Sequence, residues 1–197
     1  MPLARARQPV LVLPGFGASD NSTIGLRSQL RLLGHPVHRW RLGRNEGPTR
    51  SIVSGLRDRF DELVDRYDRP IALVGWSLGG VYATAIAQLA PDRVGQVITL
   101  GSPLRMGERR IDLADVPITS IWSRRDSVVP WQASYVEHGD RTENIEVRAA
   151  HFALGFDPLV IVAVADRLGQ RTDRWRPFEP PWWLAAAYPR HEQPATP

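Results

Sequence analysis

The sequence contains no cysteine and no lysine. Without cysteine the chain can form no disulfide and offers no thiolate to a metal ion. The absence of cysteine is typical of proteins from a reducing compartment, and we therefore expect a cytoplasmic protein. No apolar run approaches the roughly 20 residues that a membrane-spanning helix needs. The apolar stretch at Val10–Leu13 is also too short for the core of a signal peptide.

All 25 basic residues are arginines, and they exceed the 21 acidic residues by four, which gives a formal net charge of +4. The arginines are scattered along the chain and are not interleaved with aromatic residues, as they are in many nucleic-acid-binding surfaces. We expect no nucleic-acid partner and interpret the arginines as a coding preference on a solvated surface. Attraction to anionic lipid is the alternative that stays open.

Strand-like and helix-like patterns alternate along the 197 residues, which predicts a mostly parallel sheet covered by helices on both faces. This length suffices for one domain with a full hydrophobic core, so we predict a single α/β domain over 1–197. The expected strands are 10–13, 36–42, 71–74, 94–100, 118–122 and 145–148; the expected helices are 22–33, 49–67, 81–90, 132–138 and 157–168.

The last part of the chain, residues 171–197, is rich in proline and tryptophan. It contains Trp175, Trp182 and Trp183 and fits neither a helical nor a strand pattern. One interpretation is a strap that crosses the domain and buries its tryptophans. The other is a docking surface for a partner or a peripheral contact with a lipid interface.

The most informative motif is Gly75-Trp76-Ser77-Leu78-Gly79-Gly80, which lies between the expected strand 71–74 and the expected helix 81–90. G-x-S-x-G between a strand and a helix is the form of a nucleophile elbow, a sharp turn that exposes the serine hydroxyl. Glycines are needed on both sides because a Cβ there would collide with the neighbouring strand or helix. The alternative is a Gly-rich turn in which Ser77 is an ordinary polar residue.

A serine hydroxyl becomes a nucleophile when a base lies within hydrogen-bond reach and a further group orients that base. The histidines that follow Ser77 are His138, His151 and His191. His151 lies directly after the last expected strand and before the last helix, where a loop at the sheet edge would expose it. We therefore predict His151 as the base.

Asp126 is the predicted orienting acid. It lies in the loop directly after the buried strand 118–122, and Val128-Val129-Pro130 then turns the chain back. A carboxylate in this place would hold the tautomer of His151 and stabilise the imidazolium. The alternative is a salt bridge between Asp126 and Arg124 or Arg125.

The negative charge that develops on a substrate oxygen needs two fixed donors, known as the oxyanion hole. One is expected to be the backbone N–H of Leu78, directly after the nucleophile. The other comes from the loop after the first strand, Pro14-Gly15-Phe16-Gly17. We predict Phe16 N–H, with Gly17 N–H as the alternative.

Taken together these motifs resemble the α/β-hydrolase family, especially its small bacterial lipases and esterases, over about residues 9–170. The resemblance rests on the loop at 13–17, the elbow, Gly101-Ser102-Pro103, Asp126 and His151. It implies the α/β-hydrolase fold and cleavage of small carboxylic esters through an acyl-enzyme on Ser77. It implies neither a cofactor nor a metal ion.

The chain departs from lipases in two places. Pro14-Gly15 stands where many lipases carry His-Gly, and the gap at 103–117 is too short for a sizeable lid. With a minimal lid or none, we expect no strong interfacial activation and a preference for short or medium acyl chains.

Several assignments stay open. A thioesterase, an acyltransferase and a non-catalytic binding scaffold of the same fold are the rival functions, and the oligomeric state is not predicted.

Arg44 and Asn45 are expected to have a turn or capping role, with substrate contact as the alternative. Four aromatic residues are candidates for the acyl site or for ordinary packing: Phe16, Trp76, Trp131 and Phe152.

Overall fold

The computed structural model describes residues 7–105, 116–137, 139–170 and 174–189. Its six-stranded sheet has the order β2-β1-β3-β4-β5-β6, and all neighbouring strands are parallel. The strands are β1 (Val10–Leu13), β2 (Val37–Arg39), β3 (Ile71–Trp76), β4 (Val94–Leu100), β5 (Ile118–Ser123) and β6 (Thr142–Val147). The main helices are α1 (Ile24–Leu32), α2 (Arg50–Tyr67), α3 (Leu78–Leu89) and α5 (Pro158–Gly169), with a short α4 (Trp131–Ser134). The predicted parallel α/β architecture is confirmed.

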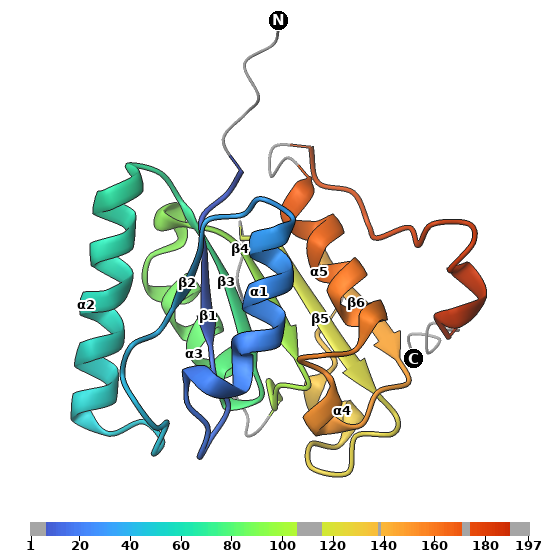
Figure 1. Ribbon diagram of the computed structural model, residues 1–197, viewed down its shortest axis with the longest axis horizontal. Coiled ribbons are helices and arrows are strands. Elements are labelled where there is room, and N and C mark those ends of the chain that lie inside the picture. Colours follow the sequence, from blue (N-terminus) through green and yellow to red (C-terminus); the bar gives the residue numbers. More distant parts are fainter. Residues whose placement is uncertain (1–6, 106–115, 138, 171–173, 190–197) are drawn as a thin grey trace, which may run out of the picture.

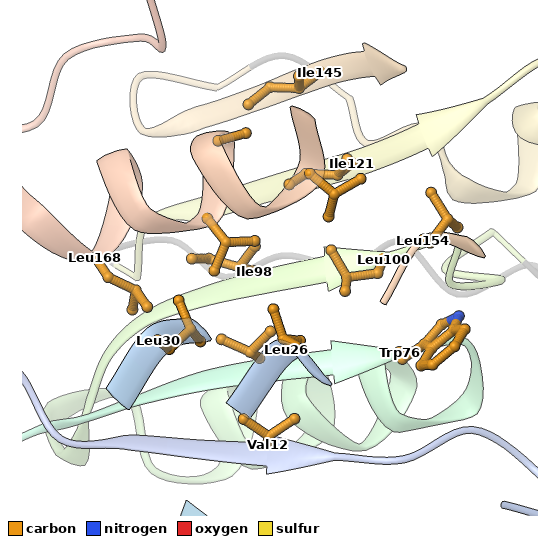
Figure 2. Packing of buried hydrophobic residues seen from close by; sticks show 14 of the residues in the cluster. Val12, Leu26, Leu30, Trp76, Ile98, Leu100, Ile121, Ile145, Leu154 and Leu168 are labelled. Atoms are coloured by element: carbon orange, nitrogen blue, oxygen red, sulfur yellow. The ribbon is translucent and has the colours of Figure 1, made fainter. Parts of the chain in front are cut away.

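The two faces of the sheet carry separate hydrophobic cores, because successive side chains of a strand point to opposite faces. In β1, Val10 and Val12 pack with α1 and α5, whereas Leu11 and Leu13 pack with α2 and α3. Figure 1 shows α1 and α5 in front of the sheet, and Figure 2 shows part of the core beneath them. Each fully buried Leu or Val side chain contributes about 1.5–3 kcal/mol to folding.

The chain changes direction across the sheet at β1. It passes from β1 through α1 to β2 on one side, and returns through α2 to β3 on the other side. The loops that follow β1 and β3 therefore diverge at the carboxyl edge of the sheet. In open α/β sheets this switch point is where ligands bind.

The strand predicted at 36–42 is shorter in the structure, where β2 ends at Arg39. Arg41 has a φ of 66°, which a strand does not tolerate. The amides of Trp40 and Arg41 donate to the carboxylate of Asp20 at 3.1 and 3.2 Å. A side chain distant in sequence therefore ends the strand.

Two elements near the edge strand also differ from their predicted bounds. The helix expected at 132–138 is only one turn, α4, because the side chain of Asn144 bonds both the N–H and the C=O of Val136. His138 lies outside the described residues. β6 begins at Thr142, three residues before the predicted strand, because Thr142–Asn144 pair with β5.

The described part of the tail, residues 174–189, lies against β6 and α5. Tyr188 is buried in the core and donates to the carbonyl of Leu159 at 2.7 Å, and Phe178 packs against the same core. Trp182 and Trp183, in contrast, are 89% and 64% exposed. The tail is thus a strap, but the prediction that it buries its tryptophans is wrong for these two.

The segment expected to be too short for a lid is only partly described, since residues 106–115 lie outside the described residues. The prediction of a minimal lid therefore stays a prediction. Among the described helices, none combines the length and the apolar character needed to cross a membrane.

Candidate active site

Ser77 lies between β3 and α3 and has a φ of 55° and a ψ of −122°. Such a conformation costs a non-glycine residue about 1–3 kcal/mol and persists only where the surroundings enforce it. The Ser77 amide donates to Leu100 O of β4 at 2.8 Å, and Ser77 O accepts from Gly80 N at 3.0 Å. The elbow is therefore held from both the sheet and the helix.

The glycines on either side of Ser77 have the steric role predicted from the sequence. A Cβ on Gly75 would collide with the backbone of Gly79 and Gly80 in α3, and a Cβ on Gly79 would collide with the carbonyl of Leu13 in β1. Backbone atoms cannot move aside as a flexible side chain can. The tight approach of β3, α3 and β1 therefore depends on these glycines.

His151 and Asp126 are joined directly. His151 Nδ1 lies 2.6 Å from Asp126 Oδ2, and the two side chains are 5% and 1% exposed. Because a carboxylate accepts, Nδ1 is the donor in this contact, and in the neutral imidazole the lone pair is then on Nε2. This is the tautomer that a general base needs.

The other carboxylate oxygen of Asp126 accepts the amides of Val128 and Val129 at 2.9 and 2.8 Å. These two bonds fix the carboxylate in the loop after β5. Arg124 pairs instead with Glu146 of β6 at 3.1 Å. The alternative in which Asp126 forms a salt bridge with Arg124 is therefore wrong.

Gly101 brings the elbow and the Asp126–His151 pair to the same place. It follows Leu100, whose carbonyl binds Ser77, and it has a φ of 52°. A Cβ on Gly101 would lie 2.8 Å from Asp126 Oδ2 and 3.2 Å from His151 Nδ1. The motif Gly101-Ser102-Pro103 did not predict this role for Gly101, although a glycine directly after the buried strand β4 is a signal for it.

The hydroxyl of Ser77 has no hydrogen-bond partner among the described residues. The structure thus joins Asp126 to His151 and holds Ser77 on the carbonyl of Leu100, the residue before Gly101, without a bond between Ser77 and His151. Catalytic hydrogen bonds often tighten only when substrate is bound.

The loop after β1 forms a turn in which Ala18 N donates to Gly15 O at 3.2 Å and Gly17 has a φ of 72°. Gly17 N donates to Asn45 O at 2.7 Å. This N–H is therefore not free for a substrate, and the alternative donor is excluded. Within the described part of the chain, Phe16 N and Leu78 N donate to no protein acceptor.

The four candidate aromatic residues divide into two pairs. Phe16 and Phe152 are 70% and 75% exposed, next to the predicted oxyanion loop and to His151. Trp76 is buried, and its indole N–H donates to His151 O at 3.2 Å. Trp131 stacks on Trp122, with the ring centroids 5.0 Å apart. Of these four residues, the two phenylalanines are the exposed ones.

A family model described as the alpha/beta hydrolase family matches residues 10–196. The chain belongs to the alpha/beta hydrolase family. The sheet order and the parallel pairing agree with this membership, and the predicted fold class is confirmed. Among the described residues of this alpha/beta hydrolase, no group of three His, Asp or Glu side chains is arranged to hold a metal ion.

Similar proteins support the same fold. A pimeloyl-[acyl-carrier protein] methyl ester esterase of Aliivibrio salmonicida is 44% identical over 55 residues, which is 26% of this alpha/beta hydrolase and 21% of that protein. The structure of a monoacylglycerol lipase of Paleococcus ferrophilus is similar, with a TM-score of 0.62 at 15% identity. The match covers 82% of this chain and 95% of the lipase chain. A lipase of Bacillus licheniformis has a TM-score of 0.66 at 12% identity, over 85% and 96% of the two chains.

Proposed function

We propose that this alpha/beta hydrolase is a serine esterase whose nucleophile is Ser77. The contact of 2.6 Å between His151 and Asp126, together with a serine on a strained elbow, supports this proposal. The names of the similar proteins, two lipases and a methyl ester esterase, agree with it.

In the proposed reaction Ser77 Oγ attacks the acyl carbon of an ester while His151 Nε2 takes the hydroxyl proton. Asp126 stabilises the imidazolium that forms. The substrate oxygen, now negatively charged, accepts from the N–H groups of Phe16 and Leu78, and each such donor accounts for about 100-fold or more in rate. His151 gives its proton to the leaving alcohol, and an acyl-enzyme remains. Water then attacks this acyl group with His151 again as the base, which releases the acid and restores Ser77.

The proposed substrates are small esters with short or medium acyl chains, in line with the short gap at 103–117. The exposed Phe16 and Phe152 would contact the acyl or alcohol group near the reaction centre. The exposed tryptophans of the tail, Trp182 and Trp183, are proposed to contact lipid at the surface of a membrane.

The decisive test combines a fluorophosphonate probe with hydrolysis of p-nitrophenyl butyrate. The wild type should be labelled and active, whereas Ser77→Ala should lose labelling and at least about 1,000-fold in kcat. Ser127→Ala, which changes an exposed serine next to Asp126, is the matched control and should keep both. An unlabelled wild type would mean a binding scaffold without catalysis.

A thioesterase or an acyltransferase would use the same residues with a different leaving group or acceptor. Rates on acyl-CoA and on p-nitrophenyl esters of equal chain length separate these functions from an esterase. Higher kcat/KM for acyl-CoA would favour a thioesterase, and transfer to an added alcohol would favour an acyltransferase.

A further inference from the structure

Asn45 is a fully buried amide that connects the two parts of the proposed oxyanion hole. It lies in the loop between β2 and α2, and its exposed fraction is 0%. A buried amide is costly unless its donors and acceptors are bonded. Here the side chain and the backbone of Asn45 together make five hydrogen bonds.

Three of these bonds hold the loop after β1 on both sides of Phe16. On one side, Asn45 Nδ2 donates to Pro14 O at 2.9 Å. On the other side, Asn45 N donates to Ala18 O and Asn45 O accepts from Gly17 N, both at 2.7 Å. Among the described residues of this turn, Gly17 N and Ala18 N are bonded, whereas Phe16 N has no protein acceptor, so its N–H stays available while the residues on both sides are fixed.

The remaining two bonds connect Asn45 to its own loop and to α3. Asn45 Oδ1 accepts from Gly47 N and from the hydroxyl of Tyr82, both at 3.1 Å. Tyr82 lies one turn after Leu78, the first residue of α3. A single side chain therefore spans from the loop that carries Phe16 to the helix that begins with Leu78.

We propose that Asn45 is a positioning residue that sets the Phe16 N–H relative to the Leu78 N–H, with Tyr82 as its support. The proposal rests on the esterase function proposed above. Donors stabilise an oxyanion only within about 2.7–3.1 Å, and a displacement of about 1 Å can lower a rate 100-fold. An amide is required because it donates to Pro14 and accepts from Tyr82 at the same time. A carboxylate has no donor for Pro14, and a hydroxyl is too short to span both partners.

The test compares Asn45→Asp, Asn45→Ser and Tyr82→Phe at a temperature well below unfolding. We expect kcat/KM for p-nitrophenyl butyrate to fall about 10–100-fold in the two Asn45 variants and about three- to tenfold in Tyr82→Phe. Because an oxyanion-hole defect acts after substrate binding, KM should change less than about threefold.

A trifluoromethyl ketone inhibitor separates positioning from a merely structural role, because its adduct with Ser77 carries an oxyanion whereas a ground-state amide analogue does not. In the positioning role, Ki for the ketone rises by the same factor by which kcat/KM falls, and Ki for the amide is unchanged. Asn144→Asp is the matched control, since the amide of Asn144 bonds the backbone of Val136 in a similar way outside the site. It should keep the wild-type kcat/KM and both Ki values.

The inference is overturned if the soluble Asn45 variants keep wild-type kcat/KM and ketone affinity, or if Ki for ketone and amide rise together. Tyr82→Phe, which removes a single hydroxyl, keeps the test available if both Asn45 variants fail to fold. If Ser77→Ala loses activity while the Asn45 and Tyr82 variants keep the wild-type activity, the inference about Asn45 is overturned and the proposed function stands. Activity that persists in Ser77→Ala overturns the proposed function itself.

Discussion

His151 Nδ1 and Asp126 Oδ2 lie 2.6 Å apart although 25 positions separate them in the chain. The two side chains are almost fully buried, at 5% and 1% exposed, so water does not compete for this hydrogen bond. Each comes from a loop at the carboxyl end of a strand, β6 for His151 and β5 for Asp126. The proton on His151 Nδ1 therefore depends on the carboxylate of Asp126.

Asp126→Asn should lower kcat for p-nitrophenyl butyrate by about 100- to 10,000-fold, because an amide in this place holds His151 in the wrong tautomer. KM should change little. Asp157→Asn is the control: Asp157 also accepts two backbone amides, those of Leu159 and Val160, but it does so at the start of α5. An Asp126→Asn variant within threefold of wild-type kcat would contradict the proposed role.

Gly101→Ala should lower both stability and activity. Its φ of 52° and the nearby Asp126 and His151 atoms leave no room for a Cβ, so we expect a loss of about 1–3 kcal/mol in the free energy of unfolding and at least about tenfold in kcat/KM. Gly34→Ala is the control. Gly34 also has a positive φ, of 86°, but an added Cβ would meet only the side chain of Arg7. Urea titration and ester hydrolysis measure the two effects. Equal activity in the two variants would contradict the prediction that a Cβ at Gly101 disturbs Asp126 and His151.

Glu143→Gln should destabilise the protein and loosen the tail. The buried Glu143 carboxylate accepts from Thr119, Arg167 and the amide of Phe178, at 2.7, 2.8 and 2.7 Å. Removal of its charge weakens the bond to the buried Arg167, which keeps its ion pair with Asp166, so we expect a cost of about 1–3 kcal/mol. Urea unfolding and limited proteolysis near Phe178 would detect both changes.

Glu137→Gln is the control for Glu143→Gln, because Glu137 pairs with Arg105 at an exposed site, where the pair contributes at most about 1 kcal/mol. If Glu143→Gln were as stable as Glu137→Gln, the buried ion pair would not be what holds the strap.

The free energy of unfolding should decrease as the pH falls, partly because His38 becomes protonated. Burial, together with the nearby charges of Arg59, Arg66, Arg31 and Arg41, lowers the pKa of His38 from 6.5 to about 4. The folded state therefore favours neutral His38, and its contribution to stability is complete above pH 6.5 and is lost as the pH falls toward 4. His38→Gln should show a shallower decline of the urea midpoint over this range.

His35→Gln, made in parallel, accounts for the second histidine whose pKa burial lowers. Carboxylates such as Glu62 contribute equally to all variants. Identical pH profiles for wild type and His38→Gln would show that His38 protonates equally in the folded and unfolded states.

The exposed tryptophans of the tail lead to a prediction about membranes. The double variant Trp182→Ala/Trp183→Ala should reduce sedimentation with vesicles of phosphatidylglycerol and phosphatidylcholine by about threefold or more. Leu89→Ala changes an equally exposed apolar residue, at 87%, at the end of α3. It should bind vesicles as the wild type does. If neither the wild type nor the variants sediment, the tail does not contact lipid.

The apolar patterns at β1, β3, β4 and β5 predicted the central strands well, because a strand buried on both faces must be apolar nearly throughout. β6 was predicted too short. Its first residues, Thr142, Glu143 and Asn144, are polar in the sequence. Glu143 is nevertheless buried, because its carboxylate pairs with Arg167. A partner 24 residues away cannot be inferred from a local pattern.

By itself the sequence determined the α/β architecture, the elbow around Ser77 and the choice of Asp126 and His151 as candidates, since these follow from local motifs and from the ends of strands. Only the tertiary structure decided which backbone N–H groups remain free. It bonds Gly17 N to Asn45 and leaves Phe16 N without a protein acceptor. Hydrogen bonds between segments distant in the chain depend on how the loops meet after folding, and no local preference of the residues encodes that meeting.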